Sequence, residues 1–584
     1  MSRFKKKLES LSRKWHIKTA DAAAVEQLSR ALLVSPVVAQ VLINRNGTDE
    51  ETSRRFLNPR LSDLLEPEAL SGVAEAVERI IKAIKAAEKI TVYGDYDVDG
   101  ITSTAILWRL LDMLGANVDY YIPHRVDEGY GLNTESILEL AASGTNLIIT
   151  VDCGITAIEQ VDAAVTAGME VIVTDHHAPG PKMPAASIIV HPMINNYPSP
   201  GSCGAMVAFK LAWALCNAYK DNGGKIRDDL RKFLLIATDF ATLGTIADVM
   251  ELVGENRSLA KYGLYSISQS QLPGIKALMQ TAGLEGKEID SMHVAFQIAP
   301  LLNAAGRIGH ARLAVELLTS DNELRSLRIA EYLKQQNNER RKVEQQILKE
   351  ASLLITAAGM DHPDKKSIVL SSDSWHIGVV GIVASRILEK FYRPTILFHS
   401  KDDIAKGSAR SIDGFNILEA IEACSEHLIG YGGHAKAAGV TIKTENIPAF
   451  TAAFEKYAGE NIRDEHFINN LDLDGLFNLG DFDDRTIFQL EKLGPFGQGN
   501  PRPIFAARGV RLIGRPRIIG SGCDHLQFAV KDSSGSMACV GFGMAPLEKK
   551  LLETDYFSIA FEPQMNDFKN AKTPQFVVKD ICFD

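Results

Sequence analysis

The stretch TVYGDYDVDG, residues 91–100, places three carboxylates, Asp95, Asp97 and Asp99, within five positions. The run KITVY that leads into them is short and β-branched, and in the ITSTAILWRLL that follows, apolar residues recur at helical spacing. The stretch therefore predicts a strand, a turn rich in carboxylates and a helix, the junction at which open α/β sheets bind ligands. Three carboxylates this close repel one another, which favours a bound cation over a solvated acidic turn.

The position of these carboxylates excludes an EF-hand calcium loop. A loop that starts at Asp95 needs a bidentate Glu at its twelfth residue, and that residue is Ile106. An EF-hand also needs a helix in front of the loop, whereas the preceding run predicts a strand. We therefore expect three carboxylates gathered at a strand end.

The length and charge of the chain limit the possible functions. Its 584 residues exceed what one hydrophobic core usually supports, so we expect about three domains. The formal net charge of −10 discourages a nucleic-acid partner. It does not exclude one, because contacts with phosphate need only a local basic path.

The cysteines and the apolar runs indicate the compartment. None of the seven cysteines forms a Cys-x-x-Cys pair, which favours a reducing compartment over a disulfide framework or a zinc site. No apolar run approaches the roughly 20 residues of a membrane span, and no apolar core of a signal peptide follows the basic N-terminus. We expect a soluble, cytoplasmic protein with no membrane partner.

The fold class predicted from the periodicity is α/β. Five apolar runs, most of them separated by helical segments, predict a largely parallel sheet covered on both faces. These runs are residues 90–93, 118–122, 146–151, 171–174 and 187–190. A charged stretch around QQNNERRKVEQQI has no Pro or Gly and predicts one connecting helix with a polar middle exposed to water.

The remaining segments complete the predicted domain organisation. A second α/β region follows the connecting helix, and after about residue 460 short alternating runs predict some five strands of a small antiparallel sheet or barrel. The first seventy residues are less informative, although ALLVSPVVAQVLI suits a packed helix. The predicted parts are residues 1–70, 71–320, 321–357, 358–460 and 461–584.

Three of the predicted strands end in the same kinds of residue. Asp95 and Asp97 follow the first, Asp152 follows NLIITV, and the triplet from Asp175 to His177 follows VIVT. If these strands are parallel neighbours, their carboxyl ends bring aspartates and histidine to one sheet edge as a metal site. Oxygen and imidazole donors without thiolate suit manganese or magnesium better than structural zinc. From its position alone, His177 is open between a structural histidine and one that meets a substrate oxygen.

The motifs DYDVDG, VDCG and TDHH, in this order and at strand ends, resemble those of the DHH phosphoesterase superfamily. Asp248 in ATLGTIADVM matches the fourth motif of that superfamily. Within the superfamily, the chain resembles the RecJ family of bacterial single-strand-specific DNA exonucleases. The matching segments are LLNAAGRIGH, WHIGVVGIVASRI, GSARS, YGGHAKAAG and LGPFGQGNPRPIF. Together these motifs cover nearly all of the chain after residue 70.

The resemblance implies a site for two divalent ions, Mn²⁺ or Mg²⁺. Asp95 and Asp152 would hold one ion, and the other would be held by Asp97, Asp152, His176 and Asp248, with Asp152 bridging. His177 would sit by the scissile phosphate, and Asp99 would support the ligands without contacting an ion. Pyrophosphatase relatives have a metal-binding His four residues before the first Asp, where this chain has Thr91. The first ion is therefore expected to have fewer protein ligands.

The resemblance also implies residues that bind the substrate. Arg307 of AGRIGH would steady the phosphate as a bidentate donor, with a structural arginine that caps a helix as the alternative. The amides that open the helix near Gly378 would bind phosphate. The further candidates are Arg125, Ser408 and Arg410 for a terminal 5′-phosphate, and His376 and His434 for other substrate contacts.

The C-terminal region resembles an OB-fold, a fold that binds single strands through a basic groove and stacked aromatic rings. Phe528, Phe542 and Phe557 are the aromatic candidates. Aromatic residues in short strands more often belong to the core, so a structural role is the competing interpretation.

The function implied is a metal-dependent 5′-to-3′ exonuclease that degrades single-stranded DNA to 5′-mononucleotides by two-metal hydrolysis, in DNA recombination and repair. It would act as a monomer, with a single-strand-binding protein and a helicase as partners. One alternative is a DHH phosphodiesterase of short oligonucleotides or cyclic dinucleotides. The other is a catalytically inactive DNA-binding member of the same fold, although such a protein would lack metal ligands that this chain keeps.

Overall fold

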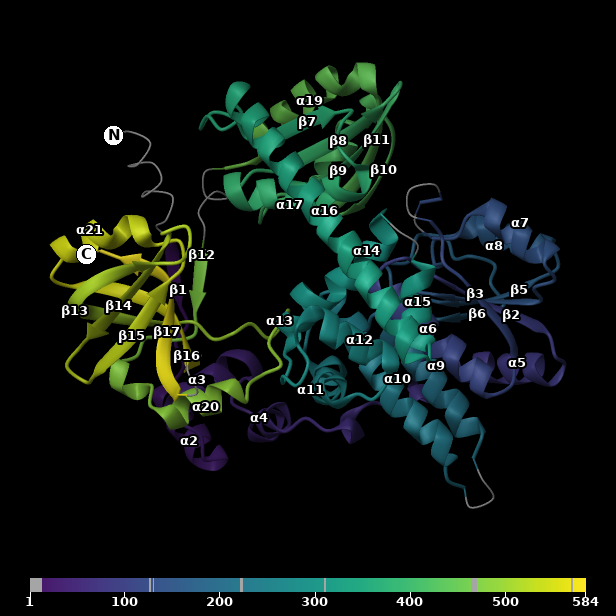
Figure 1. Cartoon of the computed structure of the whole chain (residues 1–584), viewed down its shortest axis with the longest axis horizontal. Coiled ribbons are helices and arrows are strands. Elements are labelled where there is room, and N and C mark those ends of the chain that lie inside the picture. The colour runs from purple at the N-terminus through teal and green to yellow at the C-terminus, as the bar shows by residue number, and fades with distance from the viewer. Residues whose placement is uncertain are drawn as a thin grey trace. The chain divides into compact units, whose positions relative to one another are not determined.

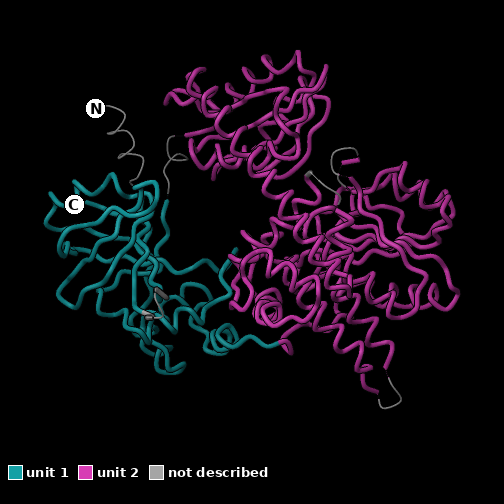
Figure 2. The backbone as a smooth tube through the Cα atoms, viewed as in Figure 1, with its two compact units in different colours: residues 1–60, 468–584 teal, residues 61–467 magenta. Residues whose placement is uncertain are grey.

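The computed structural model describes residues 13–124, 128–129, 131–220, 224–308, 311–463, 470–568 and 571–583. The chain forms two compact units, one of residues 1–60 and 468–584 and the other of residues 61–467 (Figure 2). The N-terminal segment therefore groups with the C-terminal region, which the sequence did not predict. The two units do not decide the predicted division into five parts, which stays a prediction.

The larger unit contains the predicted parallel sheet. Its strand order is β3-β2-β4-β5-β6, and every neighbouring pair is parallel. The strands are β2 (Lys89–Gly94), β3 (Asn117–Tyr121), β4 (Leu147–Val151), β5 (Glu170–Thr174) and β6 (Ile188–Val190). This confirms the α/β class.

Helices cover both faces of this sheet (Figure 1). One face packs on α7 (Thr134–Ala142) and α8 (Ile158–Thr166) through apolar residues such as Ile137 and Val161. The other packs on α5 (Val73–Lys85), α6 (Val98–Met113) and α9 (Gly204–Ala218). Every residue of β4 is buried, as a strand covered on both sides requires.

A helical region follows the sheet. It contains α10 (Asp228–Ala247), α11 (Gly254–Gln269), α12 (Pro273–Ala282), α13 (Ser291–His293), a π-helical turn η3 (Val294–Ile298), α14 (Ala299–Ile308) and α15 (Arg312–Thr319). Helix α10 packs closely on α6 and α9, since a Cβ added at Gly244 would lie 2.6 Å from the Cβ of Ala205. This close crossing sets the position of Asp248, which directly follows the last residue of α10.

The connecting helix is α16 (Glu323–Ala357), 35 residues without a break. Its N-terminal part packs in the core formed by the parallel sheet and its helices, and its C-terminal part packs in the core of the second α/β region. The expectation of a water-exposed middle is wrong for Asn337 and Arg340, which are buried. The Arg340 guanidinium hydrogen-bonds Asn337 at 2.8 Å and Glu344 at 2.6 Å, and these bonds offset the cost of burial.

The second α/β region is a mixed sheet with the order β10-β11-β9-β8-β7, in which only β7 and β8 are parallel. Its elements are β7 (Ile368–Ser372), α17 (Ile377–Phe391), β8 (Thr395–Lys401), β9 (Ile404–Arg410), α18 (Ile417–Glu422), β10 (Leu428–His434), β11 (Ala437–Lys443) and α19 (Ile447–Asn461). The glycine-rich YGGHAKAAG is thus a β-hairpin, with His434 at the end of its first strand.

The smaller unit contains a closed barrel of the strands β13-β14-β15-β17-β16. These are β13 (Phe505–Ile519), β14 (His525–Lys531), β15 (Ser536–Gly541), β16 (Phe557–Phe568) and β17 (Ala571–Cys582), with α20 (Asp484–Glu491) and α21 (Glu548–Glu553) beside them. The barrel is antiparallel as predicted, except that β15 and β17 pair in parallel.

The aromatic candidates of the barrel differ in exposure. For Phe528 and Phe557 the core interpretation is confirmed and stacking is wrong, because both side chains are buried in the barrel core. Phe542 is 60% exposed and packs edge-on against His525. Of the three, only Phe542 offers a ring face to a nucleobase.

The N-terminal segment completes the core of the smaller unit. Strand β1 (Lys14–Ile17) pairs in parallel with β12 (Asn470–Leu473), and α2 (Ala22–Leu32), α3 (Pro36–Asn46) and α4 (Glu50–Leu57) follow. The apolar ALLVSPVVAQVLI therefore forms parts of two packed helices, because Pro36 starts a new helix rather than continuing α2. Buried residues of α3 pack among the barrel phenylalanines.

No single helix of the described residues is long and apolar enough to cross a membrane. Helices α2 and α3 meet the length and composition criteria only as a pair, which is bent by 106°. Short 3-10 helices connect the main elements at η1 (Leu61–Asp63), η2 (Pro67–Ala69), η4 (Ser425–His427), η5 (Thr444–Asn446), η7 (Leu479–Asp481) and η8 (Ala545–Leu547).

Candidate metal centre

The candidate site lies at the carboxyl ends of three neighbouring strands. The last residues of β2, β4 and β5 pair side by side in register. The residue that follows each strand is an aspartate: Asp95, Asp152 and Asp175. The parallel order that the sequence required for a metal site at one sheet edge is therefore present.

The local backbone directs two of these carboxylates. Asp152 has a φ of +60°, a left-handed conformation that is uncommon outside glycine and is found at functional sites. A Cβ added at Gly204 would lie 2.6 Å from the Cβ of Asp152, so only glycine fits beside it. Asp97 caps α6 and accepts hydrogen bonds from the amides of Asp99 (2.9 Å) and Gly100 (3.2 Å).

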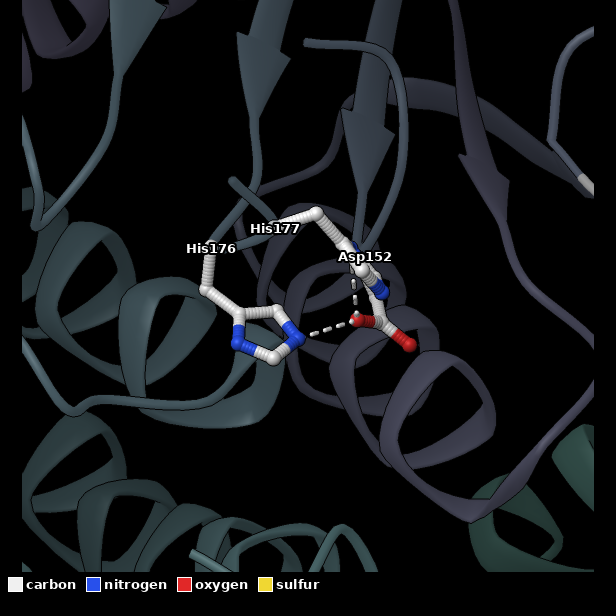
Figure 3. Close-up of side chains that lie close together, drawn as sticks. All are labelled: Asp152, His176 and His177. Carbon is white, nitrogen blue, oxygen red and sulfur yellow. Dashed lines mark ion pairs between the residues drawn. The ribbon is translucent and has the colours of Figure 1, made fainter. Parts of the chain in front are cut away.

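The two histidines of the TDHH motif both approach Asp152 (Figure 3). The Nε2 of His176 lies 3.1 Å from Asp152 Oδ1 and 3.7 Å from Asp248 Oδ2. The Nδ1 of His177 lies 4.0 Å from the same oxygen of Asp152. The side chains from β4, β5 and α10 therefore converge as the motifs predicted.

Asp99 supports the cluster from a helix end. Its two carboxylate oxygens accept hydrogen bonds from the first amides of α9, Gly204 (2.6 Å) and Ala205 (2.9 Å). The positive end of the α9 dipole favours this buried charge. The carboxylate also lies 3.7 Å from His176 Nε2, so it can orient that ring.

Asp175 and His191 hold His177. Asp175 was predicted at the sheet edge but without this role, and His191 was missed. Asp175 Oδ1 accepts a hydrogen bond from His177 Nδ1 at 2.8 Å, while Oδ2 accepts one from the Ile155 amide. The Met193 amide donates to Nδ1 of the buried His191, so the proton of that ring is on Nε2. His191 Nε2 then donates to the carbonyl oxygen of His177 at 2.8 Å. His191 directly follows β6, the position in which the other strands place their site residues, and this was the available signal.

Burial and mutual repulsion raise the pKa values of the clustered carboxyls. The pKa of Asp152 is raised well above its ordinary value, first by burial and then by the charge of Asp99 and its neighbours. The same two causes raise the pKa of Asp97 and bring that of Asp248 to about 8. A divalent cation would remove both penalties at once.

The two histidines differ in charge. Burial lowers the pKa of His176, which suits the neutral imidazole of a metal ligand. Burial would also lower the pKa of His177, but the hydrogen bond and charge of Asp175 outweigh it and raise this pKa to about 9. His177 is therefore protonated near neutral pH and suits contact with an anion.

The donor atoms fit divalent ions. They form three groups in which all atoms lie within 4.8 Å of one another: Asp95 with Asp97 and Asp152, Asp152 with His176 and His177, and Asp99 with His176 and Asp248. The first group is all oxygen and the others mix oxygen with imidazole. Such a set without thiolate favours magnesium or manganese.

Helix α14 connects the carboxylate turn after β2 with the second α/β region. The Asn303 side chain accepts a hydrogen bond from the Val98 amide, and a Cβ added at Gly306 would lie 2.5 Å from the carbonyl oxygen of Tyr96. Arg307 donates from Nη1 to the carbonyl oxygen of Gly378 at 2.9 Å. Arg307 thus stands between the carboxylate turn and the start of α17.

Three of the substrate candidates in the second α/β region form hydrogen bonds at or near α17: Ser408, Arg410 and His376. Arg410 donates from Nη1 to Ser408 Oγ at 2.9 Å and from Nε to Ser385 Oγ at 3.1 Å, so the predicted phosphate contacts adjoin. His376 caps α17 through a hydrogen bond from the Gly378 amide.

The other two substrate candidates are His434 and Arg125. His434 is exposed at the end of β10 and pairs in register with Ala437 of β11, which in turn pairs with Arg410 of β9. Arg125 lies outside the described residues.

Three segments of the chain match known families. Residues 89–238 match the DHH family, N-terminal domain, residues 364–460 the DHHA1 domain, and residues 473–580 the RecJ OB domain. Over 573 residues the chain is 37% identical to the single-stranded-DNA-specific exonuclease RecJ of Bacillus subtilis (strain 168), and the match covers 97% of this chain and 71% of that protein.

Two solved structures are similar over almost the whole chain. RecJ from Thermus thermophilus in complex with Mn²⁺ has a TM-score of 0.83 and 32% identity, covering 98% of this chain and 80% of that one. RecJ from the same organism in complex with Mg²⁺ has a TM-score of 0.77 and 30% identity, covering 98% and 78%.

Divalent metal should raise the melting temperature of the chain more at about pH 8.5 than at about pH 6. The folded pKa of Asp248, about 8, lies above its unfolded value, so the stability that the protonated carboxyl contributes is lost as the pH rises through about 8. Mn²⁺ replaces the proton over this range. Thermal unfolding with Mn²⁺ and with chelator at both pH values measures the difference. The variant Asp248→Asn should flatten the pH dependence, and equal metal-induced shifts at both pH values in the native chain would contradict the prediction.

Replacing His191 with Ala should lower the pKa of His177 from about 9 toward its ordinary value of 6.5. Without the donor to its carbonyl oxygen, the backbone of His177 relaxes and its hydrogen bond with Asp175 weakens. A histidine NMR titration, with the His177 signal assigned through His177→Gln, measures this pKa. His427→Ala is the control, since His427 lies in the second α/β region. An unchanged pKa of His177 in His191→Ala would refute the positioning role.

Proposed function

The chain belongs to the RecJ family of single-stranded-DNA-specific exonucleases, and we propose that it removes 5′-mononucleotides from the 5′ end of single-stranded DNA with two divalent ions, Mn²⁺ or Mg²⁺. The observation that carries this proposal is the convergence of Asp95, Asp97, Asp152, His176 and Asp248 at one sheet edge. The matches to RecJ proteins along the length of the chain support the substrate. An inactive DNA-binding protein would not need these ligands.

The proposed roles follow the donor groups. Asp95 and Asp152 would hold one ion, and Asp97, Asp152, His176 and Asp248 would hold the other. When bound, such a pair of ions lowers the pKa of water and offsets the charge that develops on the phosphate. Because the ions supply this chemistry, the chain needs no serine or cysteine nucleophile.

The protein groups around the ions position the substrate. His177 is held by Asp175 and His191 and is protonated near neutral pH, so it can donate to a phosphate oxygen. Arg307 steadies the same phosphate from α14. The pair Ser408 and Arg410, together with Arg125, holds the terminal 5′-phosphate, and His376 and His434 make further contacts. Binding of the free end by this pair is what sets the 5′-to-3′ polarity.

The finer biological assignments belong to the same proposal. The five-part organisation runs from the helical segment 1–70 through the DHH domain 71–320, the connecting helix 321–357 and the DHH-associated domain 358–460 to the OB-fold-like domain 461–584. The protein acts as a cytoplasmic monomer in recombination and repair, beside a single-strand-binding protein and a helicase. The matches to the DHH, DHHA1 and RecJ OB domains support the order of the three larger domains, and the similarity to RecJ exonucleases supports a role in DNA processing.

The wild-type chain should degrade a long 5′-labelled single strand with Mn²⁺ or Mg²⁺, leave duplex DNA intact and stop with chelator. Asp152→Asn should lower the rate about a thousandfold, because several kcal/mol of charge stabilisation are lost with the bridging ligand. Gel assays on 5′- and 3′-labelled single and double strands measure both. Asp162→Asn, an exposed position on α8, is the control. Cleavage confined to very short oligonucleotides would favour the small-phosphodiesterase alternative, and full activity in Asp152→Asn would remove the assigned site.

Replacing Arg410 with Ala should weaken degradation of 5′-phosphorylated strands about tenfold and that of 5′-hydroxyl strands much less. The guanidinium forms charge-assisted hydrogen bonds with a terminal phosphate, and a hydroxyl end lacks that partner. Comparing kcat/KM for the two kinds of strand gives the ratio. Equal losses on both ends would show that Arg410 does not read the end of the strand.

A further inference from the structure

A cavity of about 390 Å³ lies between α14, α16 and α17 of the larger unit. Arg307, Arg340, Arg341 and Arg386 line it, together with the ring of Phe296. We call it the arginine cavity. Its volume suits one small ligand rather than a folded partner.

The charge of the arginine cavity is only partly balanced. Glu344 pairs with Arg340 at 2.6 Å and with Arg386 at 3.4 Å, which explains these two arginines as links between α16 and α17. Arg341 is exposed and forms no hydrogen bond or ion pair within the described ranges. Packing between the helices therefore does not account for Arg341, and the cavity keeps an excess of positive charge.

Phe296 is the second feature that packing does not explain. Its side chain is 60% exposed on the π-helical turn η3, which leads directly into α14. Turns of this kind are rare and are frequently found at functional sites. An exposed aromatic ring beside guanidinium groups is the combination that binds nucleotides, because the ring stacks on a base while the arginines hold phosphate.

The arginine cavity lies beside residues that contact the carboxylate turn and residues that contact the proposed 5′-phosphate site. Asn303 lines it and also accepts the hydrogen bond from Val98 in the carboxylate turn. On α17, Arg386 lines the cavity, while the preceding residue, Ser385, bonds Arg410 of the proposed 5′-phosphate site. A nucleotide cut between these two places would lie next to the cavity.

We propose that the arginine cavity binds the released deoxynucleoside 5′-monophosphate as a product site, with its phosphate at Arg341 and its base on Phe296. The proposal rests on the proposed function. A released phosphate monoester carries a charge of about −2 near neutral pH, whereas each internal diester of the strand carries one charge. Several guanidinium groups around one small volume therefore favour the product over the backbone of the incoming strand.

Equilibrium dialysis of labelled dAMP against the full chain in chelator measures this site apart from the metals. Wild type should bind dAMP, and Arg341→Gln and Phe296→Ala should each weaken binding about tenfold. Arg328→Gln, an exposed arginine earlier on α16, and Phe488→Ala, an exposed phenylalanine on α20, are matched controls that should bind as wild type does. In nuclease assays with metal, the inhibition constant for dAMP should rise in the two cavity variants.

The outcomes separate this site from the nuclease itself. No dAMP binding by wild type, or equal binding by wild type and both cavity variants, would overturn the proposal. It would also be overturned if Arg341→Gln kept dAMP binding but lost the preference for 5′-phosphorylated strands, because the cavity would then serve the incoming end. If wild type bound dAMP through Phe296 and Arg341 but left single-stranded DNA intact, the cavity would be confirmed as a nucleotide site and the proposed exonuclease function would be contradicted.

Discussion

The structure depends on the electrostatic repulsion among buried carboxylates at one sheet edge. The parallel order of β2, β4 and β5 brings their terminal aspartates together, and burial strengthens the repulsion among them. Groups of the chain itself offset part of this repulsion: the dipole of α9 at Asp99 and the protonated ring of His177. The remainder requires cations, so metal binding and folding stability are coupled at this edge.

The same edge organises the parts of the larger unit around it. Helix α14 can approach the carboxylate turn because residue 306 is glycine, and its next residue, Arg307, reaches the carbonyl oxygen of Gly378 on α17. The unbroken α16 spans the DHH-type core and the second α/β core, so the two regions are joined by a rigid element as well as by this contact. The proposed substrate groups of the second region, which include Arg410 bonded to Ser385 of α17, are thereby connected to the metal edge through α17 and Arg307.

The sequence predicted those features that recur with a period or a motif. Strand ends, the long helix and the carboxylates of the DHH-type motifs are local signals, and the structure has them where the sequence placed them. For the barrel phenylalanines the sequence favoured a core position but could not say which of the three is exposed, because the same strand pattern fits either face until the barrel closes. Nor did it predict His191 or the pairing of β1 with β12, since both depend on contacts between residues distant in sequence.

Thr91 explains why the two proposed ions are unequal. A histidine at this position could add a ligand, but Thr91 is buried in β2 and its hydroxyl bonds that of Thr145 at 2.9 Å. A structural threonine pair thus occupies this position, and the proposed ion on this side would have only the carboxylates of Asp95 and Asp152 as protein ligands. An all-oxygen site with few protein ligands leaves more positions for water and phosphate, whereas the site at His176 gains an imidazole donor. Because Asp152 is assigned to both ions, the ion with fewer protein ligands would depend on the ion at His176, and on water or substrate phosphate to complete its coordination.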